Sequence, residues 1–215
     1  MPVRKIPKNH LVVTGAFSST KANRVIAFES TLEKECMLLL DFDDDVDHYE
    51  EQPVRVPVPG VPQGYVVDIL VHFRDPGRPC ELTEIKTEED LERKRDDYAP
   101  KFAAADAFCK QRGWMFVIKT DKDIRTSRLE NLKFLRRYRN FSPAPEQSAL
   151  VLERLESMGG ESTSEMLLDA LASTPEERGG LLPVLWNLLL TGQLRTELDV
   201  EMPVDVPLWL PCPSP

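Results

Sequence analysis

The sequence predicts a mixed α/β domain followed by a small, mostly helical domain. In the first two thirds of the chain, short apolar strands alternate with amphipathic helices. A Pro-rich stretch, Phe141-Ser-Pro-Ala-Pro-Glu146, then disfavours any continuing helix. Three helical segments and two short extended pieces follow it. We therefore divide the chain into residues 1–145 and 146–215.

Local patterns define the elements of the first domain. Ser30-Thr31 predicts a cap before an apolar helical stripe, and Asp75-Pro-Gly-Arg-Pro79 predicts a turn between two strands. Residues 46–58 lack helical period and contain prolines, which predicts an interrupted strand. Residues 88–112 form a long amphipathic pattern, which predicts a helix interrupted near Pro100. The predicted order is helix 30–42, strand 46–58, strand 64–73, strand 80–87, helix 88–112, strand 114–120 and a basic helix 127–139.

The second domain is predicted to contain helices at 147–158, 164–172 and 176–191. Extended pieces at 192–197 and 207–210 follow. Three helices followed by a small hairpin are typical of a winged-helix domain. A Pro-rich tail ends the chain.

Composition indicates a soluble protein of the reducing cytoplasm. Of 215 residues, 41% are hydrophobic and 29% are charged, and no apolar run approaches the ~18 residues of a membrane span. The N-terminus lacks the apolar stretch of a signal peptide. The four cysteines form no CxxC pair, which argues against a zinc site or a disulfide framework.

Charge is divided unevenly between the two domains. The net charge is −9, and residues 146–215 account for it with three basic and twelve acidic groups. Residues 1–145 are neutral, with basic stretches near both ends that can bind phosphate. For DNA contact we predict the following basic residues: Arg4, Lys5, Lys8, Lys21, Arg24, Arg136, Arg137 and Arg139.

Asp68, Glu84 and Lys86 form the most informative pattern. Glu84 and Lys86 point to the same face of one strand, and Asp68 joins them if the two strands of the hairpin pair. Two carboxylates and an ammonium in one small volume are costly unless a divalent cation lies between the acids. Mg²⁺ suits such a donor set. Asp…Glu-X-Lys is the signature of restriction-endonuclease-like nucleases, although a solvated strand face with an ion pair gives the same pattern.

Glu33 is a further candidate ligand. It lies four residues before Met37, on the apolar stripe of the first helix. Glu29 precedes the cap and is expected outside the helix, and Glu35 is expected in solvent. The three histidines are too dispersed in sequence to predict a ligand set.

These residues, in this order, resemble the TnsA family, the restriction-endonuclease-like endonuclease subunit of heteromeric cut-and-paste transposases. The likeness covers roughly residues 25–140. Its matching segments are Ser30-Thr-Leu-Glu33, Leu40-Asp-Phe42, Glu51-Gln52-Pro53, Val67-Asp68-Ile69, Glu84-Ile-Lys86, Phe116-Val-Ile-Lys-Thr120-Asp-Lys-Asp-Ile124 and Asn131-Leu132.

The resemblance implies a central mixed sheet flanked by helices and a Mg²⁺-dependent endonuclease, with Mn²⁺ as a substitute. The implied catalytic residues are Glu33, Asp68, Glu84 and Lys86, and the Ile85 carbonyl is a further candidate ligand for one of two ions. Some family members carry glutamine at the position of Glu84. The enzyme would cut the 5′-end strand at each transposon end in a bacterial cytoplasm, with a TnsB-like transposase and a TnsC-like ATPase as partners.

Two alternatives remain open at this point. One is a stand-alone restriction or repair nuclease of the same fold, and the other is a DNA-binding adaptor with structural carboxylates. The acidic second domain is expected to bind protein rather than DNA, because its charge repels phosphate. Trp209, between prolines in the tail, is the candidate anchor.

Overall fold

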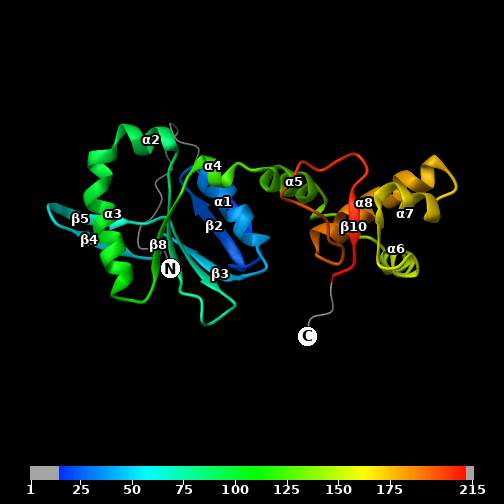
Figure 1. Cartoon of the computed structure of the whole chain (residues 1–215), viewed down its shortest axis with the longest axis horizontal. Coiled ribbons are helices and arrows are strands. Elements are labelled where there is room, and N and C mark those ends of the chain that lie inside the picture. The colour runs from blue at the N-terminus through cyan, green and yellow to red at the C-terminus, as the bar shows by residue number, and fades with distance from the viewer. Residues whose placement is uncertain (1–14, 212–215) are drawn as a thin grey trace. The chain divides into compact units, whose positions relative to one another are not determined.

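The protein is described from a computed structural model that defines residues 15–211. The chain divides into two compact units, Met1–Arg125 and Thr126–Pro215, and each is described by itself (Figure 1). The division falls at residues 125–126 rather than at the predicted 145–146. The reason is that Leu135, on the helix before the Pro-rich stretch, is buried in the apolar core of the second unit.

A four-stranded mixed sheet forms the centre of the first unit, in the order β3-β6-β7-β8. Its strands are β3 (Val46–Glu51), β6 (Ile69–Phe73), β7 (Glu81–Ile85) and β8 (Met115–Lys119). β3, β6 and β7 pair antiparallel, whereas β7 and β8 pair parallel. The predicted hairpin around the turn at residues 75–79 is therefore confirmed as β6–β7.

Helices cover both faces of this sheet. α1 (Thr31–Asp41) contacts β3 on one face, where the buried Tyr49 hydroxyl donates to the Met37 carbonyl. α3 (Arg95–Lys110) contacts β8 on the other face, where Leu70 and Leu82 pack with Ala105 (Figure 1). The short helices α2 (Glu88–Arg93) and α4 (Asp121–Ile124) precede and follow this α3–β8 pair. The predicted mixed α/β fold with a flanked sheet is confirmed.

Two hairpins were absent from the sequence prediction. β1 (Gly15–Ser19) and β2 (Arg24–Phe28) pair antiparallel, with Phe17 and Ile26 buried. β4 (Arg55–Val58) pairs with β5 (Val61–Val66). The stretches predicted as single strands at 46–58 and 64–73 are thus each divided in two, since the chain leaves the central sheet to form the β4–β5 hairpin.

The long predicted helix is interrupted at a different residue. Lys94 has φ −114° and ψ 26°, and it separates α2 from α3. Pro100 lies inside α3 instead of ending a helix. Pro100 has no backbone N–H, so α3 contains it at the cost of one helical hydrogen bond.

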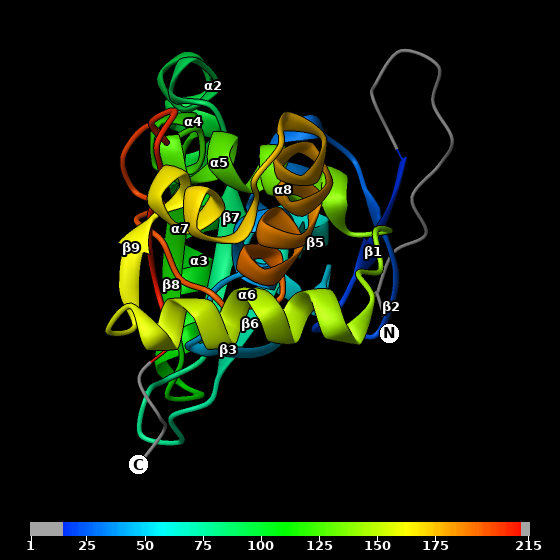
Figure 2. The ribbon, with the colours of Figure 1, turned by 90° about the vertical axis from the view of Figure 1, so that its right-hand side faces the viewer.

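The second unit contains three main helices, α6 (Pro145–Ser157), α7 (Ser164–Leu171) and α8 (Pro175–Leu190), close to the predicted bounds (Figure 2). α5 (Ser127–Leu135) and a 3₁₀ turn, Arg136–Tyr138, precede them. β9 (Glu161–Thr163) pairs antiparallel with β10 (Pro207–Trp209), and Arg195 bridges to Trp209 from the other side. The predicted strand at 192–197 is reduced to that single bridge.

Among residues 15–211, no helix has the length and apolar character required to cross a membrane.

Candidate active site

Asp68 lies at the junction between β5 and β6, where the polypeptide enters the central sheet. Its Oδ2 accepts a hydrogen bond from the backbone nitrogen of Ile85 at 2.8 Å, and its side chain is 17% exposed. Ile69 pairs with Thr83, so the register places Asp68 opposite Glu84. The antiparallel hairpin therefore brings Asp68 and Glu84 together, as the sequence predicts.

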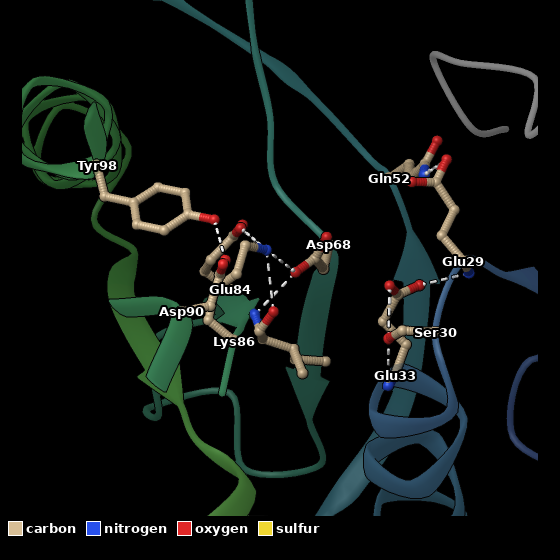
Figure 3. Close-up of polar contacts among 10 residues, drawn as sticks. Glu29, Ser30, Glu33, Gln52, Asp68, Glu84, Lys86, Asp90 and Tyr98 are labelled. Carbon is tan, nitrogen blue, oxygen red and sulfur yellow. Dashed lines mark hydrogen bonds and ion pairs between the residues drawn. The ribbon is translucent and has the colours of Figure 1, made fainter. Parts of the chain in front are cut away.

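Lys86 joins the two acids. Its Nζ lies 3.4 Å from Asp68 Oδ2 and forms an ion pair with Glu84 Oε1. It also donates to the Ile85 carbonyl at 2.9 Å. Figure 3 shows these contacts converging on the ammonium group. Glu84 is 1% exposed. Two acids and one base thus share a small volume in which Glu84 is closed to water, whereas Asp68 and Lys86 are partly exposed.

Burial dominates the electrostatics of this cluster. Burial, and then the charge of Asp68, raises the pKa of Glu84 to about 7. Burial also raises the pKa of Asp68, against the opposing effect of Lys86. Burial lowers the pKa of Lys86, but the two carboxylates outweigh it and the net shift is upward. Lys86 therefore stays positively charged. Its single positive charge does not balance the negative charges of Asp68 and Glu84 together.

The cluster opens into a cleft with a volume of about 890 Å³. Asp68, Glu84 and Lys86 line it together with Tyr65 from β5. Burial, and then the Glu84 carboxylate, raises the pKa of the Tyr65 phenol. The remaining lining residues lie just after β2 and on β4, β5 and α3: Glu29, Arg55, Val61, Pro62, Gln63, Gly64, Val66 and Lys101.

Sequence reasoning did not single out Tyr65, Arg55 or Lys101. They reach the cleft through the β4–β5 hairpin and α3. Strand alternation could not have indicated that Tyr65 lies near Asp68, because residues three apart on a strand point to opposite faces. Arg55 and Lys101 give the cleft two cations in addition to Lys86.

Glu33 is held by the start of its own helix. Ser30, the predicted cap, accepts from the Glu33 backbone nitrogen at 3.1 Å. The Glu33 carboxylate in turn accepts from the Ser30 hydroxyl and from the Glu29 backbone nitrogen, both at 2.9 Å (Figure 3). Burial, and then the nearby charge of Asp68, raises the pKa of Glu33 to about 7. Glu33 thus lies within electrostatic reach of Asp68 but is bonded to the helix N-terminus.

Glu29 is the acid that lines the cleft from this side. Its Oε1 accepts from Gln52 Nε2 at 3.2 Å. Glu35, expected in solvent, is buried and forms an ion pair with Arg125 at 2.9 Å, so that expectation is wrong. The α1 surface packs against neighbouring segments on more than one side, which the helical stripe alone does not reveal.

One observation indicates that the Asp68–Glu84 pair can bind a divalent ion. Glu84 Oε2 is buried and makes no hydrogen bond of normal length, although a buried carboxylate oxygen normally has one, and the Tyr65 hydroxyl near this carboxylate is likewise without one. The residues that could hold an ion are Asp68, Glu84 and the Ile85 carbonyl. Glu33 is not gathered with them: among residues 15–211, three ligand-type side chains have atoms within 4.8 Å of one another only at His48, Glu50 and His72.

The predicted DNA-contact residues have different surroundings. Arg4, Lys5 and Lys8 lie outside the described residues. Lys21 donates to the Asp43 and Val46 carbonyls, and Arg24 forms an ion pair with the buried Glu51. Residues 15–28 therefore form a packed hairpin and not a basic arm. In the second unit, Arg137 and Arg139 are exposed, and Arg136 is half-buried.

A buried acid–lysine cluster that opens into a cleft also lined by Arg55 and Lys101 can hold a divalent ion and stabilise charge that develops on a phosphate. The fold and the cluster together are consistent with a nuclease. Residues 43–121 match the family described as TnsA-like endonuclease N terminal. This match supports a TnsA-like endonuclease domain in this part of the chain and confirms the resemblance drawn from the sequence, and it suggests a nuclease of the transposase type. No curated protein matches the chain.

Proposed function

We propose that the protein is the metal-dependent endonuclease subunit of a heteromeric transposase, cutting the 5′-end strand at each transposon end. The observation that carries this proposal is the convergence of Asp68, Glu84 and Lys86 at the base of one open cleft. The match of residues 43–121 to TnsA-like endonucleases supports the same reaction. The mixed sheet and the position of the acid–lysine cluster also support a restriction-endonuclease-like fold.

The donor chemistry favours Mg²⁺, with Mn²⁺ as a substitute. Asp68 and Glu84 offer carboxylate oxygens and Ile85 offers its carbonyl, which are the hard ligands that Mg²⁺ prefers. Glu33 would complete a two-ion site once its carboxylate exchanges the Ser30 hydroxyl for an ion. A bound Mg²⁺ supplies positive charge at the scissile phosphate and lowers the pKa of bound water.

Lys86 and the cleft walls supply the remaining chemistry. The charged Lys86 ammonium lies between the acids, where it orients the attacking water and offsets charge that develops on the phosphate. Arg55 and Lys101 line the cleft and neutralise the flanking phosphates of a DNA strand. Phosphate contacts carry little sequence information, so end recognition belongs to the partner transposase.

The proposed partners are a TnsB-like transposase, which cuts and joins the 3′ ends, and a TnsC-like ATPase, in a bacterial cytoplasm. A stand-alone restriction or repair nuclease is the alternative enzyme. Cutting of naked DNA by the purified chain without partners would favour that alternative.

Divalent metal distinguishes the nuclease from a DNA-binding adaptor with structural carboxylates. Mg²⁺ or Mn²⁺ should raise the melting temperature of the full chain, because ligands that bind only the folded state stabilise it. Asp68→Asn should remove this rise. The matched control is Asp97→Asn, an exposed acid on α3 that should keep it. An unchanged metal-induced rise in Asp68→Asn would contradict the assigned ligand.

For the second unit we propose a winged-helix domain that binds protein. Its three helices, the β9–β10 pair and the Arg195 bridge support the winged-helix arrangement. Trp209 is 37% exposed, so β10 leaves part of the indole available to a partner. Trp209→Ala in the full chain should weaken assembly with a partner protein while DNA cleavage by an already assembled complex is kept. Unchanged assembly would remove Trp209 from the interface.

A further inference from the structure

A second group of metal-ligating side chains lies on strands β3 and β6. His48 and His72 are direct partners in the antiparallel ladder, and their rings stack with centroids 4.2 Å apart. Glu50, two residues along β3 on the same face, has its Oε1 3.6 Å from Nε2 of His72. One ligand atom from each of the three lies within 4.8 Å of the other two. The dispersed histidines of the sequence are therefore brought together by strand pairing.

Each imidazole already has a partner on its Nδ1 side. His48 Nδ1 lies 2.8 Å from Asp47 Oδ2, and His72 Nδ1 lies 3.4 Å from Cys80 Sγ. Metal-ligating histidines commonly bond one ring nitrogen to such an outer partner and present the other to the metal. Nε2 of His72 is buried and makes no hydrogen bond of normal length, and Glu50 Oε1 lies 3.6 Å from it. The Nδ1 contacts leave Nε2 as the nitrogen that each ring can offer to a metal.

We propose that His48, Glu50 and His72 bind one divalent transition metal ion, Zn²⁺. Two imidazoles and one carboxylate form a zinc donor set that leaves a fourth position open. Imidazole ligands favour Zn²⁺ over Mg²⁺, which prefers oxygen. The side chains are 45%, 40% and 27% exposed for His48, Glu50 and His72, so an ion can enter from solvent. The two rings are stacked almost parallel, so the imidazoles must turn out of this stack for both Nε2 atoms to bind one ion.

This site is separate from the cleft. His72 follows Asp68 by four residues on an extended chain, which corresponds to about 13 Å. None of the three zinc ligands lines the cleft. A bound ion would tie β3 to β6, the strand that begins next to Asp68. The bound ion would therefore stabilise the sheet that carries the proposed catalytic carboxylates.

The test is a calorimetric titration of the full chain with ZnCl₂ in saturating MgCl₂, so that Mg²⁺ occupies the cleft. One Zn²⁺ should bind per chain. His48→Ala should weaken the affinity by more than about 10-fold, and Glu50→Gln, which preserves side-chain shape, should do the same. Asp68→Asn should leave zinc affinity unchanged, and circular dichroism should report a native fold for every variant.

Three results would overturn the proposal. The first is no zinc binding above the Mg²⁺ background. The second is wild-type affinity in both His48→Ala and Glu50→Gln. The third is loss of zinc binding in Asp68→Asn, which would place the ion in the cleft.

Discussion

The Asp68 carboxylate accepts a hydrogen bond from the backbone nitrogen of Ile85 at 2.8 Å. This contact fixes the residue before β6 against the end of β7. The same oxygen, Oδ2, lies 3.4 Å from Lys86 Nζ, which also donates to the Ile85 carbonyl. The backbone of one hairpin thereby sets the spacing of the proposed metal ligands, and four predictions test how these residues work.

The stability of the metal-free protein should depend on pH through Glu84. Its folded-state pKa is raised from an ordinary 4.5 to about 7, so the folded state prefers the protonated acid. This contribution is fully present below pH 4.5 and is lost as pH rises through 7. The loss is on the order of 3 kcal/mol, from the size of the shift. Glu84→Gln should make the dependence less steep in denaturant unfolding measured with a chelator from pH 5 to 8, and Glu33, whose pKa burial also raises to about 7, accounts for the remainder. An equally steep dependence in the variant would show that another group is responsible.

Variants of Ser30 and Glu33 distinguish a role in helix capping from a role in catalysis. Ser30→Ala removes the side-chain acceptor for the Glu33 backbone nitrogen and should cost about 1 kcal/mol of stability, with cleavage retained. Glu33→Gln keeps one carbonyl oxygen for the cap but removes the charge, so it should lose cleavage with little change in stability. Unfolding and cleavage are measured on the same preparations. If Glu33→Gln cuts DNA normally, Glu33 is only a capping residue.

Arg55 and Lys101 should contribute to DNA binding from the walls of the cleft. Replacing both by alanine should reduce the salt dependence of DNA affinity by about two phosphate contacts. Lys110→Ala, at the far end of α3, is the matched control and should leave the slope unchanged. Arg24→Ala should instead lower stability, because it leaves the buried Glu51 without its partner. A wild-type slope in the double variant would place the DNA elsewhere.

The sequence predicts the elements near the active site well, because local signals are strong there. The Ser30 cap, the hairpin turn at residues 75–79 and the Glu84-Ile85-Lys86 alternation each act within a few residues. The structure confirms that the hairpin brings Asp68 to Glu84 and Lys86.

The features that sequence missed depend on contacts between distant segments. Glu35 is buried because Arg125, ninety residues away, pairs with it. His48 and His72 meet only through the β3–β6 register, and Arg55 reaches the cleft only because the β4–β5 hairpin leaves the sheet. The domain boundary differs because Leu135 packs into a core made largely of later residues. None of these contacts has a local signature.

Strand-resolved cleavage of transposon-end DNA by Asp68→Asn tests the central claim most directly. The reaction contains the full chain, its TnsB-like and TnsC-like partners and Mg²⁺, with Asp97→Asn as the matched control. Cleavage of the 5′-end strand should fall by at least about 100-fold, whereas 3′-end joining and the control continue at the wild-type level. Cleavage of the 5′-end strand by Asp68→Asn at the wild-type rate would contradict the account.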